Sequence, residues 1–164
     1  PPCGPEPAEL SALFGIIPDV SHGSDALFWE IAQKKRPFVA SHSNAASVQN
    51  WARNLTDEQI AAVADCGGVI GLNFCADFLS DDGSAAGQRT AILAHVRAIL
   101  NAGGEDVLAV GSDFDGIPEN AYLHDPSCMP SFFETLADEF GVRIAEKAAR
   151  DNFLRVLRDV VGDK

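Results

Sequence analysis

The sequence has little positive charge, few cysteines and no long apolar run. Only 12 lysines and arginines stand against 24 aspartates and glutamates, which gives a formal net charge of −12. A surface of that sign repels phosphate backbones and anionic lipids, so it argues against binding to nucleic acids or membrane surfaces. No apolar run approaches the roughly 20 residues that cross a bilayer, and the first residues lack a basic flank followed by an apolar stretch. We therefore expect a soluble protein, with a cytoplasmic location favoured.

The four cysteines are too scattered for a disulfide framework. No two of them form a C-x-x-C pair, which argues against a redox motif and against a zinc site made of cysteines. Cys66 and Cys75 flank an apolar run at residues 69–72 and are interpreted as small buried hydrophobic residues. What the chain does have is 46% apolar residues in a length of 164. That is enough for one domain with a sizeable core.

The pattern along the chain predicts an α/β fold. Residues 1–7 hold four of the nine prolines and are expected to form an extended lead-in to a domain at residues 8–164. From there, short apolar runs alternate with helical patterns. The expected strands are 15–20, 37–41, 69–74 and 107–112, and the expected helices are 25–35, 56–65, 88–101, 131–140 and 143–161. The strands are apolar throughout, as in a parallel sheet that helices cover on both faces, so we expect four successive βα units.

Polar side chains follow three of these strands. His22 follows the first strand, His42 the second and Asp113 the fourth. In parallel α/β folds, ligand sites form at the carboxyl ends of the strands. Two histidines one βα unit apart lie on neighbouring strands and can reach one metal ion, for which neutral imidazole is a preferred ligand. The alternative, that each is a hydrogen-bonded structural histidine, stays open at this point.

Other polar residues are less decisive. Arg53 is either a solvated loop residue or a fork that binds a substrate carboxylate. Asp113 is either a turn residue or a site carboxylate, and its place after a buried strand favours the site. Asn73 near the end of the third strand supports either a site or a loop role. His95 lies within a helical pattern and His124 in a loop before a proline, and both are interpreted as structural.

Six segments together resemble the carboxyl-terminal half of the membrane (renal) dipeptidase family, in order and in spacing. They are Asp19-Val20-Ser21-His22, Ser41-His42-Ser43-Asn44-Ala45, Arg53-Asn54-Leu55-Thr56-Asp57-Glu58, Gly71-Leu72-Asn73-Phe74, Gly111-Ser112-Asp113-Phe114-Asp115-Gly116 and Asp151-Asn152-Phe153-Leu154-Arg155-Val156. The resemblance implies a zinc-dependent (β/α)₈ barrel that hydrolyses dipeptides at a site of two zinc ions. It further implies that His22 and His42 ligate one zinc, that Arg53 holds the substrate carboxylate, and that Asp113 binds the substrate amino group or moves the proton.

The sequence also departs from that family. The family's first strand carries a His-x-Asp pair for the other zinc and its third strand a bridging Glu. This chain has no His-x-Asp and no Glu at a strand end before Ile16. We therefore expect the second half of a TIM-like barrel, incomplete alone, with ligands for at most one of the two zinc ions. Pro18 is a further anomaly, because proline removes a hydrogen-bond donor from a central strand.

Four βα units cannot close a barrel, so we expect two exposed strand edges and an uncovered sheet face. The predicted partner is the complementary barrel half, on a separate chain or in a longer protein, and the alternative is a second copy of this chain. The predicted function is zinc-dependent dipeptide hydrolysis, with this chain supplying half of the site. Two alternatives remain: a non-catalytic barrel half that acts in assembly, and another metal-dependent hydrolase of the amidohydrolase-like barrels.

Overall fold

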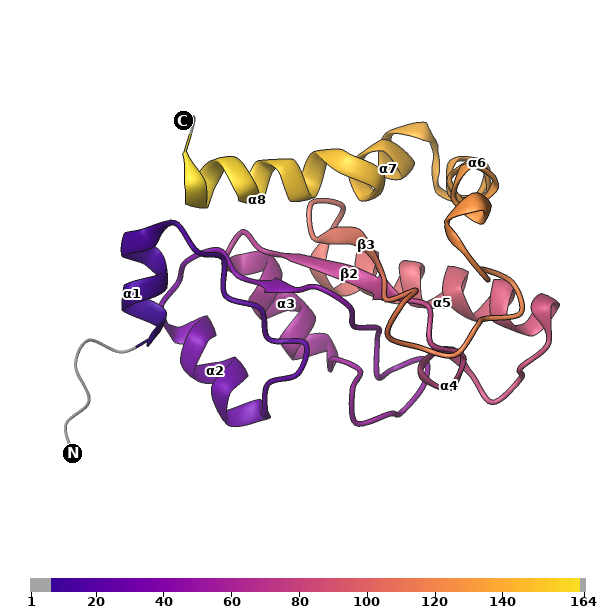
Figure 1. Cartoon of the computed structure of the whole chain (residues 1–164), viewed down its shortest axis with the longest axis horizontal. Coiled ribbons are helices and arrows are strands. Elements are labelled where there is room, and N and C mark those ends of the chain that lie inside the picture. The colour runs from indigo at the N-terminus through magenta and orange to yellow at the C-terminus, as the bar shows by residue number, and fades with distance from the viewer. Residues whose placement is uncertain (1–6, 163–164) are drawn as a thin grey trace.

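The computed structural model describes residues 7–162 and shows helices on both sides of a short parallel sheet (Figure 1). The expected lead-in lies outside the described residues except for Pro7, which begins the first helix. The elements in chain order are α1 (Pro7–Phe14), α2 (Asp25–Gln33), β1 (Val39–Ala40), α3 (Asp57–Asp65), β2 (Val69–Asn73), α4 (Ala76–Leu79), α5 (Ala85–Gly103), β3 (Leu108–Ser112), the 3₁₀ turn η1 (Pro126–Cys128), α6 (Met129–Phe140), α7 (Val142–Glu146), the π-helical turn η2 (Lys147–Asp151) and α8 (Asn152–Val161). None of the helices in this part of the chain has the length and apolarity needed to span a membrane.

The sheet has the order β1-β2-β3 in the described residues, and both pairings are parallel. Three of the expected strands are therefore confirmed. The remaining expected strand, residues 15–20, is wrong. This segment contributes only one bridge to the sheet, between Asp19 and Val39. In that bridge Val20 N–H donates to the Val39 carbonyl and Val39 N–H donates to the Pro18 carbonyl. Pro18 and Pro37 have no N–H with which to continue the ladder toward the amino terminus, and this explains why the pairing stops.

One face of the sheet packs against α3 and α5. Ile70 and Leu108 point to this side and join a buried cluster with Ile60 of α3 and Ile92 of α5. The predicted capping box begins α3: Gln59 N–H donates to Thr56 Oγ1 at 3.2 Å, and Thr56 N–H donates to Gln59 Oε1 at 2.9 Å. The helices thus cover this face of β2 and β3, and β2 is buried over its whole length.

The other face of the sheet is partly covered by the last helix (Figure 1). Val39, Val69 and Ala109 of the three strands form a small buried cluster with Val156 of α8. Arg155 of the same helix donates to the Gly67 and Asp106 carbonyls at 2.6 and 2.9 Å. The expectation of an uncovered sheet face is therefore wrong for the part of the face that α8 covers. A hollow of about 450 Å³ remains beside α8 on this side.

His95 lies inside α5 with none of its surface exposed and has both ring nitrogens in hydrogen bonds. Ala45 N–H donates to its Nδ1 at 3.1 Å, so the ring is neutral and its Nε2–H donates to the Leu79 carbonyl at 3.0 Å. These bonds tie the loop after β1 and helix α4 to α5. The predicted structural role for His95 fits this geometry.

Burial of His95 lowers its pKa from 6.5 to about 4, which makes the fold sensitive to acid. Because the unfolded chain binds the proton more readily, stability is full above pH 6.5 and is lost as the pH falls toward about 4. We expect the free energy of unfolding to fall by about 3 kcal/mol over this window from His95 alone. Urea unfolding of the wild type and of His95→Gln at several pH values checks this. The variant should show a clearly shallower fall in stability between pH 6.5 and 4 than the wild type, and equal slopes would contradict the assignment.

Candidate active site

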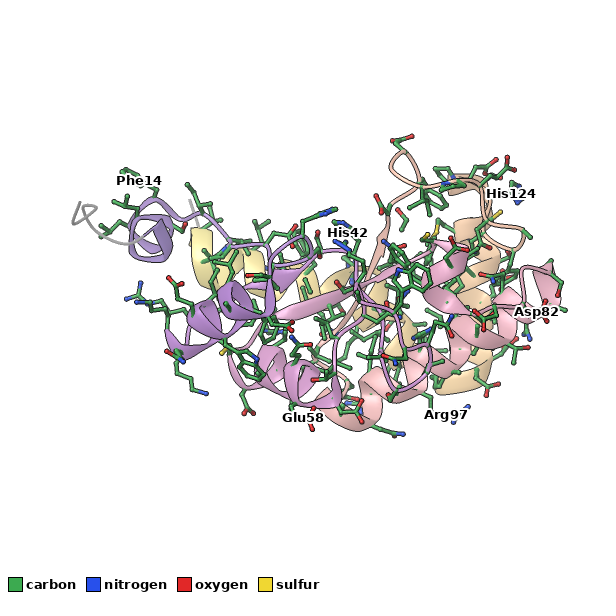
Figure 2. All side chains as sticks on the ribbon, turned by 90° about the horizontal axis from the view of Figure 1, so that it is seen from below. Phe14, His42, Glu58, Asp82, Arg97 and His124 are labelled. Carbon is green, nitrogen blue, oxygen red and sulfur yellow. The ribbon has the colours of Figure 1, made fainter. Side chains whose placement is uncertain are left out.

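Polar residues meet at the carboxyl ends of the strands. His22 follows the bridged residue Asp19, His42 follows β1, Asn73 ends β2, and Asp113 follows β3. Figure 2 shows His42 on the side of the molecule opposite Glu58 of α3. The parallel order of the strands therefore brings together side chains that are far apart in the sequence.

His22 and His42 lie side by side, as the sequence predicted. Their Nε2 atoms are 2.9 Å apart, and their ring centroids are 4.8 Å apart with the planes tilted by 52°. His22 is exposed and His42 is half-buried. Both rings point to one spot that solvent can reach.

The hydrogen bonds around the pair assign its tautomers. Arg53 Nη1 lies 3.0 Å from His22 Nδ1, and arginine can only donate, so His22 carries its proton on Nε2. That proton is donated to His42 Nε2. His42 in turn carries its proton on Nδ1, which donates to Ser41 Oγ at 2.7 Å.

Asp19 and Ser41 orient the His42 ring from behind. Ser41 Oγ donates to Asp19 Oδ2 at 2.5 Å, and Asp19 Oδ1 accepts the backbone N–H groups of Ser21 and Ser41 at 3.1 and 3.0 Å. Loss of water around Asp19 acts to raise its pKa, but the hydrogen bonds from Ser41 and Ser21 outweigh this effect and the pKa is lowered. The carboxylate therefore stays charged and fixes the proton of His42 on Nδ1 through Ser41.

The surroundings keep His42 neutral. Burial is the largest effect and lowers its pKa. Nearby charged groups have opposite effects: Asp113 and Asp19 act to raise the pKa, while His22 and Arg53 act to lower it. The net result is a pKa below the ordinary value of 6.5. A neutral ring with its Nε2 lone pair directed outward is the form that binds a metal ion.

Arg53 comes from the loop between β1 and α3 and reaches the histidine pair. Besides its bond to His22, its guanidinium lies 5.9 Å from the centroid of the Phe78 ring. The side chain is half-buried, and its partner here is an uncharged ring nitrogen rather than a carboxylate. The interpretation of Arg53 as a solvated loop residue therefore does not describe its position.

Asp113 is held at the end of β3 by the backbone and by Asn73. The pairing of β2 and β3 shifts register after Leu72, and Ser112 and Asp113 have positive φ angles of 28° and 70°. Such angles are uncommon outside glycine, and aspartate tolerates them better than most residues. Asn73 Nδ2 donates to Asp113 Oδ2 at 3.0 Å. The irregular strand end thus aims this carboxylate toward the site, and Asn73 is the residue that orients it.

The histidine pair fits a zinc ion by the chemistry of its donors. Two nitrogens bound to one tetrahedral zinc lie roughly 3.3–3.4 Å apart, given Zn–N bonds near 2.0–2.1 Å. The observed 2.9 Å fits a shared proton, so the rings need to open by a few tenths of an ångström. His22 also needs to move its proton from Nε2 to Nδ1, which breaks the hydrogen bond from Arg53. His22 and His42 are thus the residues that would hold such an ion, and its binding would release Arg53.

The structure brings together the four candidate site residues that the sequence proposed, and it adds groups around them that the sequence did not single out. His22, His42, Arg53 and Asp113 gather at one end of the sheet. Asp19 and Ser41 were noted only as parts of motifs, and the structure gives them a positioning role. A signal was present, since His22 and His42 each directly follow a serine, and a hydroxyl next to a site histidine is a candidate partner for its second nitrogen.

Residues 8–162 match the family model described as membrane dipeptidase, peptidase family M19. Among curated proteins, the chain is 41% identical over 146 residues to an uncharacterized protein from the pqqA 5′ region of Klebsiella pneumoniae. It is 35% identical over 159 residues to the dipeptidase ataJ of Aspergillus terreus. The aligned parts cover 87% and 92% of this chain but 54% and 38% of those proteins. The chain therefore spans about half, or less, of the length of these relatives.

Solved structures match the fold over nearly the whole chain. The dipeptidase AC, a metallopeptidase of family M19, superposes with a TM-score of 0.85 at 30% identity over 95% of this chain and 46% of its own. A metallopeptidase from Rhodobacter sphaeroides, liganded with a phosphinate mimic of the dipeptide L-Ala-D-Ala, has a TM-score of 0.84 at 30% identity over 93% and 45%. An amidohydrolase from Pseudomonas aeruginosa, 24% identical, supports the fold alone with a TM-score of 0.82. The predicted partial barrel is confirmed.

Proposed function

The chain belongs to the membrane dipeptidase family, peptidase family M19, and from this membership we propose that it supplies the carboxyl-terminal half of a zinc-dependent dipeptidase site. One observation carries the proposal: His22 and His42 direct their Nε2 atoms at one point, beside Arg53 and near Asp113. These are the groups that hydrolysis of a dipeptide needs, namely a metal site, a cation for the carboxylate and a carboxylate for proton transfer.

Arg53 binds the carboxylate of the dipeptide in this proposal. Its planar fork matches a carboxylate with two parallel hydrogen bonds. In the structure the fork donates to His22, and a zinc ion on His22 would remove that acceptor. The guanidinium is then available to the substrate, at a place already close to the histidine pair. The dipeptide mimic bound to the Rhodobacter sphaeroides metallopeptidase supports a substrate of this size.

In this proposal Asp113 transfers the proton during hydrolysis. A carboxylate at this place accepts a proton from the attacking water and donates it to the amine that leaves, or pairs with the free amino group of the substrate. Asn73 keeps one oxygen in a fixed direction through its 3.0 Å bond. The zinc ion, when bound, would supply the activated water and polarise the peptide carbonyl.

The site is completed by further protein. The sequence has no His-x-Asp pair, and the chain spans 46% and 45% of its M19 structural relatives. We propose that a complementary barrel half brings ligands for the second zinc ion. The hollow beside α8, lined in part by Ser41, Gly71 and Gly111 on the strands, lies on the sheet face that such a half would cover.

Arg53→Lys in the completed protein is expected to raise KM for dipeptides about 10–100-fold with a smaller change in kcat. Lysine keeps the charge but loses the two parallel hydrogen bonds, a difference of about 1.5–3 kcal/mol. Steady-state kinetics with a dipeptide and with the same dipeptide amidated at its carboxyl terminus checks this. The amide should be a poor substrate for the wild type and should lose little more in the variant. The matched control is Arg97→Lys, because Arg97 pairs with Glu139 on the surface. An unchanged KM in Arg53→Lys would remove Arg53 from the substrate site.

A substrate panel tests the proposed function itself. The completed protein is assayed with dipeptides, N-blocked dipeptides, cyclic amides, lactones and phosphoesters. Hydrolysis of free dipeptides above all others is the expected result. A preference for lactones, cyclic amides or phosphoesters would instead favour another hydrolase of the amidohydrolase-like barrels, and no hydrolysis by a zinc-loaded, completed protein would favour a role in assembly.

A further inference from the structure

A second cluster of metal-ligating side chains lies in the loop between β3 and α6. His124, Asp125 and Cys128 each place a ligand atom within 4.8 Å of the other two. His124 lies on the same side of the molecule as His42 but at a different place (Figure 2). None of the three takes part in the site proposed above. The sequence interpretation of His124 as a structural residue did not consider Cys128 beside it.

Two of the three distances within the cluster match a tetrahedral ion, and the third, between Cys128 and Asp125, lies within 4.8 Å. Zinc bonds of about 2.0–2.2 Å to nitrogen or oxygen and about 2.3 Å to sulfur put neighbouring ligand atoms roughly 3.3–3.8 Å apart. Here Cys128 Sγ lies 3.5 Å from His124 Nε2, and Nε2 lies 3.7 Å from Asp125 Oδ2. Cys128 Sγ is also 3.2 Å from Nδ1, so a rotation of the exposed ring turns either nitrogen toward the sulfur.

Backbone hydrogen bonds fix the Asp125 side chain and the turn that carries Cys128. Asp125 Oδ1 accepts the Ser127 N–H at 2.7 Å, which leaves Oδ2 free on the side of His124. Cys128 N–H donates to the Asp125 carbonyl at 3.1 Å and closes the turn. On one side, Leu123 is buried, and on the other, Phe132 of α6 is fully buried. Because the ligands are at positions i, i+1 and i+4 of an ordered turn, binding orders little additional chain.

The donor set selects the kind of ion. One thiolate, one imidazole and one carboxylate suit zinc and its neighbours among the divalent transition metals, whereas magnesium and calcium prefer oxygen ligands alone. His124 and Asp125 are exposed, so an ion can enter from solvent. We propose that His124, Asp125 and Cys128 form a binding site for one divalent transition-metal ion, zinc foremost, with water in the remaining position. The bound ion ties the loop after Asp113 to the start of α6.

Cobalt titration tests this site separately from the histidine pair. Cobalt bound to a thiolate gives an intense ligand-to-metal band in the near ultraviolet, and cobalt bound by His22 and His42 alone does not. The wild-type chain is expected to develop this band with one equivalent of cobalt and to lose it on addition of zinc. Cys128→Ser should abolish the band. The control Cys66→Ser should keep it, because Cys66 is buried with its thiol donating to the Ala32 carbonyl, and so should His42→Ala, because neither removes a ligand of this site.

Two further variants distinguish a site from a single reactive cysteine. His124→Gln should weaken cobalt binding at least tenfold. Loss of a residue that only supports a ligand already lowers metal affinity about 10–100-fold, and loss of a ligand should lower it at least as much. Asp125→Asn keeps the capping oxygen for Ser127 but removes the anionic ligand, and it should also weaken binding. Circular dichroism on each variant shows whether the fold is intact. The proposal is overturned if the wild type gives no thiolate band, if Cys128→Ser retains it, or if His124→Gln and Asp125→Asn bind cobalt as tightly as the wild type.

Discussion

The purified 164-residue chain is expected to hydrolyse dipeptides on the order of 10³-fold more slowly than the same chain joined to a complementary barrel half. The chain brings two imidazoles, one arginine and one carboxylate to the site. It has no His-x-Asp pair for a second ion. A single, incompletely ligated zinc ion binds weakly, so less of the protein carries zinc. It also stabilises only part of the negative charge that develops in the transition state, so the rate of hydrolysis is lower.

The comparison is made by adding the upstream half of a full-length relative, as a separate chain or as a fusion, and measuring kcat/KM for a dipeptide at a fixed zinc concentration. The same half paired with His42→Ala is the control for activity that comes from the added half. Hydrolysis by the chain alone at the rate of the completed protein would show that its own residues make a full site.

His42→Ala in the completed protein is expected to remove one zinc equivalent and to lower kcat/KM by about 10³-fold or more. The ring supplies one of the two nitrogens that meet at 2.9 Å, and no other imidazole contacts His22 in the described structure. Ser41→Ala provides a graded comparison. It removes the acceptor of the 2.7 Å bond to His42 Nδ1 but leaves the ring, so zinc affinity should fall about 10–100-fold while full occupancy returns at saturating zinc.

Metal analysis after gel filtration, together with zinc titrations, measures both effects. Ser47→Ala is a suitable control, because the Ser47 hydroxyl donates to Asp57 on the exposed surface at 2.9 Å, away from the histidine pair. Unchanged zinc content in His42→Ala would remove this residue from the set of ligands. Equal effects of Ser41→Ala and His42→Ala would show that Ser41 does more than orient the ring.

The sequence was sufficient for features that depend on local patterns. The apolar runs predicted β1, β2 and β3, and the Thr56–Gln59 spacing predicted the start of α3. The placement of His22 and His42 followed from the rule that parallel strands end at one edge. These predictions rest on hydrophobic periodicity and capping, both of which are set by residues close in the sequence.

Features that depend on distant contacts were not predictable in the same way. The sequence marks Pro18 as an anomaly in the run 15–20, but only the structure shows that its pairing with β1 is limited to the bridge between Asp19 and Val39. Val39 and Val69 are buried against Val156 of α8, and Arg155 of the same helix donates to the Gly67 and Asp106 carbonyls, so these contacts join segments far apart in the sequence. The bond from Arg53 to His22 joins two loops and has no sequence pattern of its own.

Anomalous diffraction at the zinc edge, on crystals of the zinc-loaded completed protein, tests most directly whether His22 and His42 share an ion. The expected result is a peak about 2.0–2.1 Å from a ring nitrogen of both residues, with Arg53 turned away from His22. A zinc peak bound to only one of the two rings, or to neither of them, would contradict the account.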